Sequence, residues 1–285
     1  MCRLFGLTAG AEPVTAKFWL LQAPDSLRKQ SHREPDGTGL GYFGRDRRPH
    51  VDKQPLAAFR DREFVREARE VESSTFVAHI RFASTGALEL RNTHPFEQRG
   101  RLFAHNGVLE DLPRLERRLG DAMSLVGGDT DSERLFALIT TEIERHGGDV
   151  GAGIQAAVEW VAANLPVLSL NFVLITADEL WALRYPDTHE LHRLERAAGG
   201  VDGGALEQVS SHGTRVSSAP AAARPTVVVA SEVMDADPGW RALGAGELLQ
   251  VKPTLETVTR MVIDTPPAHP LSLEDLAATA RASQS

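Results

Sequence analysis

The first half of the chain alternates between stretches in which apolar residues recur at helical spacing and stretches with extended character. The spacing predicts helices over 16–30, 59–71, 111–120, 127–148 and 150–166. Extended stretches are predicted at 37–44, 50–52, 74–84 and 100–107. The helix within 127–148 is the clearest, because Thr130 and Glu133 have the spacing of a capping box and a Gly-Gly pair follows.

Beyond residue 166 the pattern changes to strands. Extended runs occupy 168–176, 179–186, 189–196, 225–231 and 246–253. Many strands follow one another without a helix between them, which favours antiparallel sheets in a layered arrangement of helices and sheets. The Gly-, Ala- and Pro-rich segments 197–208 and 217–225 are predicted to be mobile surface loops, and 266–285 a poorly packed tail.

Length, charge and cysteine content exclude several classes of protein. A length of 285 residues suits one core, and a formal charge of −8 leaves no basic face for nucleic acid. The single cysteine excludes an internal disulfide. Because no signal peptide and no apolar run of about 20 residues is visible, we expect a cytoplasmic protein without membrane contact.

Two patterns that could indicate a cofactor or metal site are not supported by the residues around them. GLGYFG (39–44) matches the dinucleotide fingerprint, but an Arg-rich turn follows it instead of a helix. Its glycines are better explained by tight turns or close backbone approach within a hairpin. His79, His94 and His105 lack the spacing of zinc ligands. We therefore expect neither a metal nor a cofactor.

Four short stretches carry candidate chemistry. They are Cys2-Arg3, HIRFAS (79–84), HNG (105–107) and DTDSE (129–133). Each alone has a structural explanation: a buried thiol, a surface ion pair, a hairpin turn and a helix cap. Taken together they contain the groups that an acyl-transfer site requires.

Removal of Met1 would place the thiol of Cys2 beside a free α-amine. Such an amine has a pKa near 8, so a useful fraction is an unprotonated base at neutral pH. It can accept the thiol proton while sulfur attacks a carbonyl carbon. The Asn106 side-chain amide and the Gly107 N–H, held in a tight turn at a strand end, would stabilise the oxyanion. Arg81 is suited to a substrate carboxylate and Asp131 to its ammonium group.

The ordered motifs resemble the class II glutamine amidotransferases, whose nucleophile is an N-terminal cysteine. The opening MCRLFG, the Asp36-Gly37 pair and VVVASEVMDADPGW (227–240) resemble the stand-alone branch that includes the γ-glutamyl hydrolase of ergothioneine synthesis. The resemblance implies a single amidotransferase domain over 2–265. The implied fold is α+β: a four-layer αββα sandwich of two antiparallel sheets.

By the same resemblance Cys2 is the nucleophile and its α-amine the general base. Asn106 and Gly107 are the oxyanion hole, and Arg81 and Asp131 anchor the substrate. Further candidate substrate-binding residues are His79, Phe82, Ser231 and Glu232. Thr38 replaces an aromatic residue that often follows the Asp-Gly pair in relatives, so the pocket wall formed by that aromatic is not expected here.

We therefore expect hydrolysis of the γ-amide of glutamine or of a γ-glutamyl conjugate through a Cys2 thioester. Two alternatives remain. The chain is the ammonia-donating subunit of a separate synthase, or it is a catalytically silent scaffold that binds an amino acid. Ser231 and Glu232 are equally well explained as a strand end with a solvated turn.

Overall fold

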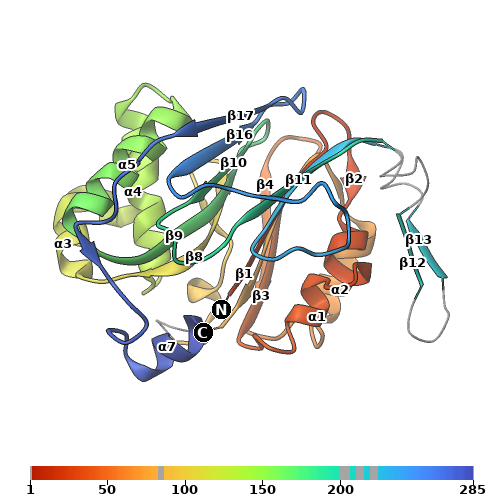
Figure 1. Ribbon diagram of the computed structural model, residues 1–285, viewed down its shortest axis with the longest axis horizontal. Coiled ribbons are helices and arrows are strands. Elements are labelled where there is room, and N and C mark those ends of the chain that lie inside the picture. The colour runs from red at the N-terminus through yellow and green to blue at the C-terminus, as the bar shows by residue number, and fades with distance from the viewer. Residues whose placement is uncertain (1, 83–86, 199–205, 210–214, 219–223, 285) are drawn as a thin grey trace.

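The computed structural model of the chain describes residues 2–82, 87–198, 206–209, 215–218 and 224–284. Two large β-sheets pack face to face, and helices cover both outer faces (Figure 1). The predicted four-layer αββα sandwich is thereby confirmed.

The first sheet is antiparallel and has β1 at its centre. Its strands, in spatial order, are β15 (Arg241–Ala242), β11 (His192–Arg196), β14 (Thr226–Ala230), β1 (Arg3–Thr8), β6 (Thr75–Arg81), β3 (Gly37–Phe43) and β4 (Pro49–Gln54).

The second sheet is antiparallel except for one short parallel strand, β18 (His269–Pro270), which pairs with β9. Its other strands, in spatial order, are β17 (Thr257–Met261), β16 (Glu247–Val251), β10 (Leu180–Arg184), β9 (Pro166–Ile175), β8 (Arg101–Leu109) and β7 (Phe96–Gln98).

Successive side chains along a strand face opposite sides of its sheet, which explains how each sheet packs between two other layers. On β9, Phe172 and Leu174 face the helices, whereas Val173 and Ile175 face the other sheet. Because both faces of each sheet are covered, these strands are almost continuously apolar, as is typical of sheets buried on both sides.

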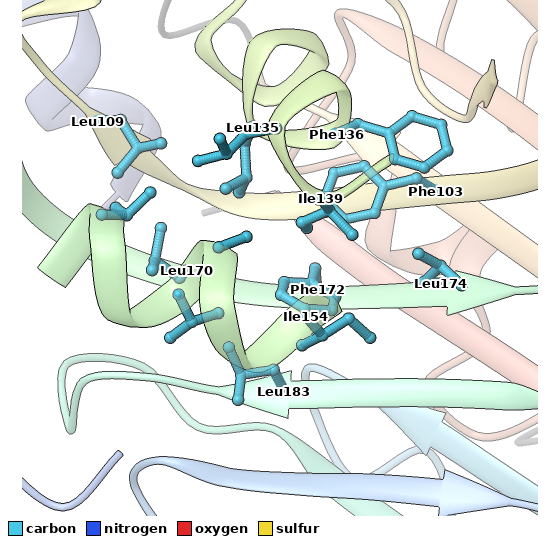
Figure 2. Close-up of a cluster of buried hydrophobic side chains, with 14 of the residues drawn as sticks. Phe103, Leu109, Leu135, Phe136, Ile139, Ile154, Leu170, Phe172, Leu174 and Leu183 are labelled. Atoms are coloured by element: carbon cyan, nitrogen blue, oxygen red, sulfur yellow. The ribbon is translucent and has the colours of Figure 1, made fainter. Parts of the chain in front are cut away.

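Two long helices cover the second sheet. They are α4 (Asp131–Arg145) and α5 (Val150–Asn164), and they are packed against each other and against β8, β9 and β10 (Figure 2). Three short helices belong to the same half of the molecule as the second sheet: α3 (Leu112–Leu119), η2 (Leu90–Asn92) and η3 (Gly120–Leu125). The first sheet is covered by η1 (Phe18–Gln22), α1 (Leu27–Gln30) and α2 (Arg62–Glu70).

The predicted helix over 16–30 is wrong as one element. The structure has a single π-helical turn, η1, and a separate turn, α1. Ala23 is extended, with ψ of 151°, because a residue before proline is pushed out of the helical region and Pro24 has no N–H to continue the ladder.

The C-terminal segment is more ordered than the expected loose tail. Leu276 and Ala280, the latter in α7 (Ala278–Gln284), pack on Val108 and Leu168. The Arg281 side chain donates hydrogen bonds to the carbonyls of Leu273, Glu274 and Leu276. These contacts tie the segment to the strands β8 and β9.

The expected mobile loops at 197–208 and 217–225 lie largely outside the described residues. Two described pieces there, β12 (Leu206–Val209) and β13 (Arg215–Ser218), form a two-stranded antiparallel sheet. A second small sheet joins β2 (Val14–Thr15) and β5 (Glu72–Ser73). Within the described part of the chain, none of the helices combines the length and the apolar character that crossing a membrane requires.

Candidate active site

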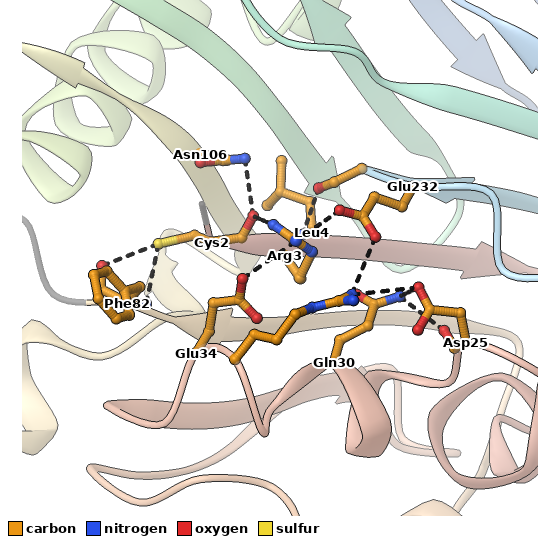
Figure 3. Close-up of polar contacts among 11 residues, drawn as sticks. Cys2, Arg3, Leu4, Asp25, Gln30, Glu34, Phe82, Asn106 and Glu232 are labelled. Atoms are coloured by element: carbon orange, nitrogen blue, oxygen red, sulfur yellow. Dashed lines mark hydrogen bonds and ion pairs between the residues drawn. The ribbon is translucent and has the colours of Figure 1, made fainter. Parts of the chain in front are cut away.

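Cys2 is held by the centre of the first sheet. It directly precedes β1, which β14 and β6 flank, and its side chain is 7% exposed. The Phe82 backbone N–H donates to Sγ, and the thiol donates to the Phe82 carbonyl, each at 3.2 Å (Figure 3). The thiol therefore lies against the end of β6, far along the sequence from residue 2.

Burial raises the pKa of the Cys2 thiol above its ordinary value. The Phe82 N–H and the Arg81 cation act in the opposite direction, because both stabilise the thiolate. A free thiolate is therefore disfavoured at rest, and attack by sulfur requires a base that takes the proton as the new bond forms.

Asn106 and Gly107 lie within β8 and are not in a tight turn, so that part of the prediction is wrong. Asn106 is opposite Asn171 and Gly107 opposite Leu170 on β9, one residue before a register shift. A Cβ on Gly107 would lie 1.9 Å from the Ser169 carbonyl oxygen. The Asn-Gly pair occurs here because β8 and β9 approach closely, which only glycine permits.

The Asn106 side chain contacts the backbone of the candidate nucleophile, Cys2. Its Nδ2 donates to the Cys2 carbonyl at 3.0 Å, and the residue is buried. Ser169 Oγ donates to the Asn106 carbonyl at 3.2 Å and so links this strand to β9. Asn106 thus contacts residue 2, although it is not among the residues that line the pocket.

Asp131 and Arg81 both reach the pocket from the ends of regular elements. Asp131 is the first residue of α4, and its carboxylate accepts the backbone N–H groups of Leu109 and Ser132, each at 2.9 Å. Arg81 ends β6, and its Nη1 donates to the Ala87 carbonyl at 3.1 Å. Both charged side chains are almost fully buried and line one pocket.

Three buried histidines that are distant in sequence also line this pocket. The rings of His79 and His94 are 4.2 Å apart between centroids, and His105 Nδ1 lies 3.0 Å from Ser132 Oγ. Burial lowers the pKa of His79 to about 3 and holds that of His94 well below its ordinary value. These rings are therefore neutral at physiological pH.

The pocket itself is small, about 20 Å³. It brings together Cys2 and five of the eight other predicted site residues, and it adds four residues that were not predicted to be in the site. It is lined by Cys2, His79, Arg81, Phe82, His94, His105, Gly107, Thr130, Asp131 and Ser132. Larger hollows lie elsewhere on the surface, but the described residues that line them include no cysteine, serine or histidine.

Ser231 and Glu232 are not among the pocket-lining residues. Ser231 Oγ accepts the Leu4 N–H at 2.8 Å, and Glu232 pairs with Arg3 at 2.6 Å. Both contact residues that follow Cys2 on β1 rather than the pocket.

Arg3 had no predicted role of its own within the stretch Cys2-Arg3, and Glu34 was not predicted to lie near the site. Arg3 Nη2 lies 3.2 Å from Glu34 Oε1, and both side chains are buried. A signal was present: a charged residue begins an otherwise apolar central strand, and such a residue needs a buried partner.

Thr38 and the glycines of β3 take structural roles. Thr38 Oγ1 donates to the Leu56 carbonyl at 2.7 Å and is fully buried, so it is not a substitute for the aromatic wall. A Cβ on Gly39 would lie 2.0 Å from the His94 carbonyl oxygen. The interpretation of GLGYFG as a site of close backbone approach in a hairpin is confirmed.

One group of carboxylates has the geometry of a possible cation site. Among the described residues, oxygen atoms of Asp52, Glu63 and Glu67 lie within 4.8 Å of one another on β4 and α2. Burial, with Asp52 next in importance, raises the pKa of Glu67 to about 7. Protonation of Glu67 therefore relieves the repulsion between these acids without an ion.

The chain is similar to known proteins over most of its length. The family model of class-II glutamine amidotransferases matches residues 1–271. A probable glutamine amidotransferase of Saccharomyces cerevisiae is 28% identical over 52% of this chain and 47% of that protein, so the chain spans about half the length of that relative. The γ-glutamyl-hercynylcysteine sulfoxide hydrolase of Mycobacterium tuberculosis is 27% identical over 93% of this chain and 97% of that protein.

A solved structure shares the fold. It is a class-II glutamine aminotransferase domain protein from Silicibacter pomeroyi, with a TM-score of 0.60 and 19% identity over 91% of this chain and 98% of that one.

Proposed function

Since the chain belongs to the class-II glutamine amidotransferase family, we propose that it hydrolyses the γ-amide of glutamine or of a γ-glutamyl conjugate through a thioester on Cys2. The observation that carries the proposal is the convergence of Cys2, Arg81 and Asp131 on one buried pocket.

The proposed first half-reaction is acyl transfer to sulfur. Once Met1 is removed, the α-amine of Cys2 accepts the thiol proton while Sγ attacks the γ-carbonyl carbon. The negative charge that develops on oxygen is stabilised by the Asn106 amide and the Gly107 N–H. For this the Asn106 Nδ2 has to exchange the Cys2 carbonyl, its acceptor at 3.0 Å, for the oxyanion.

To complete this step, the protonated α-amine gives its proton to the leaving nitrogen, and ammonia or an amine departs as the thioester forms. The second half-reaction regenerates the enzyme: the α-amine deprotonates a water molecule, whose oxygen attacks the thioester carbon. When this intermediate collapses, the C–S bond breaks, the amine returns the proton to Sγ, and glutamate is released. Throughout, Arg81 holds the α-carboxylate of the glutamyl group and Asp131 its ammonium.

The alignment with the mycobacterial hydrolase supports hydrolysis, because it extends over nearly the whole of both chains. The alignment with the mycobacterial hydrolase spans 97% of that protein, so a chain of this size is sufficient for hydrolysis there. By contrast, a glutamine–fructose-6-phosphate aminotransferase of Bradyrhizobium diazoefficiens is matched over only 22% of its length.

The test is glutamate release, measured by mass spectrometry, from glutamine and a panel of γ-glutamyl amides. We expect turnover by the unmodified chain and none by Cys2→Ala. Turnover that survives in Cys2→Ala excludes the thioester, and active protein whose intact mass includes Met1 excludes the terminal amine as base. Tight binding of glutamine without any turnover would indicate the silent scaffold instead.

A further inference from the structure

Arg3 lies at the centre of a charged cluster directly beside the candidate nucleophile (Figure 3). Its Nη2 lies 2.6 Å from Glu232 Oε1 and 3.2 Å from Glu34 Oε1. The Arg3 side chain is 8% exposed and that of Glu34 is 4% exposed. A buried arginine between two carboxylates has little freedom to reorient, because each broken pair leaves an uncompensated charge.

The guanidinium of Arg3 also turns back to the residue before it. Its Nη1 lies 3.4 Å from the Cys2 carbonyl oxygen, which also accepts the Asn106 Nδ2 at 3.0 Å. The Cys2 carbonyl is thus held by donors from two sides, while the thiol points away from it toward Phe82 (Figure 3). Fixing this carbonyl restricts the backbone rotation that would carry Sγ out of the pocket.

The acids that hold Arg3 come from separate parts of the chain. Glu34 lies between α1 and β3, and Glu232 follows β14. Ser231, next to Glu232, bonds both backbone groups of Leu4: its Oγ accepts the Leu4 N–H and its N–H donates to the Leu4 carbonyl. The start of β1 is therefore fixed by side chains as well as by sheet pairing.

We propose that Arg3, held by Glu34 and Glu232, is a positioning residue that orients Cys2 for attack. The inference rests on the proposed function only where it refers to attack on a substrate. The orientation of the Cys2 thiol does not depend on which substrate is attacked. Arg3 acts through the Cys2 carbonyl and is not among the described residues that line the pocket.

Ion pairs at the edge of this cluster should contribute less to the position of Cys2 than the pairs made by Arg3. Glu232 Oε2 lies 3.3 Å from Arg33, whose side chain is 56% exposed. An exposed ion pair contributes little, since water and salt screen it. Arg33→Ala should therefore change the reactivity of Cys2 by less than about twofold.

The experiment measures alkylation of Cys2 by iodoacetamide together with steady-state glutamine hydrolysis. In Arg3→Ala we expect the alkylation rate, taken on its high-pH plateau, and kcat to fall about ten- to a hundredfold. KM should change little, because Arg81 and Asp131 are untouched. The high-pH plateau isolates orientation from changes in the thiol pKa. Arg3→Lys should recover only part of the rate, since one ammonium lacks the fork that spans two acids and a carbonyl.

Arg196→Ala is the matched control. Arg196 has an 11% exposed side chain and lies 3.1 Å from Asp235 and 3.7 Å from Asp237, so it too is a buried arginine between two acids. It lies on β11, and its hydrogen bonds and ion pairs among the described residues do not include residue 2. We expect a comparable loss of stability with unchanged alkylation and kcat per folded molecule. Intact masses confirm that all variants carry the same N-terminus.

The outcomes separate the two proposals. Equal slowing in Arg3→Ala and Arg196→Ala, or no slowing in Arg3→Ala, overturns the positioning role even if glutamine is hydrolysed. If no γ-glutamyl compound is hydrolysed but alkylation slows in Arg3→Ala alone, the positioning role stands and the proposed function fails.

Discussion

At the scale of single residues, Asp131 combines a charge with a structural role, because each of its two carboxylate oxygens accepts one backbone N–H. Its carboxylate also lines the pocket. In Asp131→Asn we expect KM for glutamine to rise about tenfold or more, because a charged partner for the substrate ammonium is lost. Initial rates over a range of glutamine concentrations measure this.

Thr130→Ala is the control for this change. Thr130 Oγ1 accepts the Glu133 N–H at the start of α4, so its loss weakens the same helix end by about 1 kcal/mol without removing a charge. An equal rise in KM in both variants would assign the effect to the helix end and not to the carboxylate.

The Asn106 side chain tests the oxyanion hole. In Asn106→Ala we expect kcat to fall about 10²- to 10³-fold with a smaller change in KM, as for removal of one oxyanion donor. Single-turnover rates of glutamate formation measure the chemical step directly. A fall in binding affinity with an unchanged chemical step would contradict this role.

At the scale of elements, the contact between β8 and β9 depends on one missing side chain. A Cβ on Gly107 would overlap the Ser169 carbonyl oxygen, so Gly107→Ala should force these strands apart and lower the free energy of unfolding by about 2 kcal/mol or more. Activity should fall with it, because Asn106 moves with the strand. Urea unfolding and glutamate release measure the two effects.

Gly127→Ala provides the comparison. Its Cβ would meet only a flexible Glu133 oxygen at 3.8 Å, so we expect a change within about 0.5 kcal/mol. Equal losses in both variants would show that glycine is not specifically required at 107.

The elements also show what a sequence can predict. Capping and amphipathic spacing identified α4, and Thr130 accepts the Glu133 N–H as expected. The other half of the capping box differs, because the Glu133 side chain accepts the Gly128 N–H instead of the Thr130 N–H. The Asn106-Gly107 pair was misread as a turn, because local propensity favours a turn and only contact with β9 reveals the need for glycine. Likewise the three histidines have no local spacing. His79 on β6 and His105 on β8 come together because the two sheets pack face to face.

At the scale of the whole molecule, four buried histidines should make the fold sensitive to acid. Burial lowers the pKa values of His79, His94, His105 and His189 in the folded state. Their contribution is fully present above the unfolded pKa of about 6.5 and is lost as the pH falls toward the folded values. For His79 and His94, whose pKa values are lowered most, we expect the free energy of unfolding to drop by about 1 kcal/mol each between pH 7 and 5.5, and His105 and His189 should add to the loss in the same direction.

Acids whose pKa values are raised oppose this trend, and Glu67 is the one with the clearest shift. Because the folded pKa of Glu67 is raised to about 7, its stabilising contribution is present at low pH and is lost as the pH rises through 7. Glu67→Gln should therefore steepen the loss of stability toward pH 5.5, and His189→Gln should flatten it. Urea unfolding at several pH values measures both, and a flat profile for the unmodified chain would contradict the assignment.

The position of Cys2 at the head of the central strand has one further consequence, for inactivation by heat. Sites built on loops commonly lose activity below the temperature at which the core melts, because loops open locally. Here the residue that bears the thiol is continuous with β1, between β14 and β6. Activity and the far-ultraviolet signal of the sheets should therefore disappear in a single thermal transition.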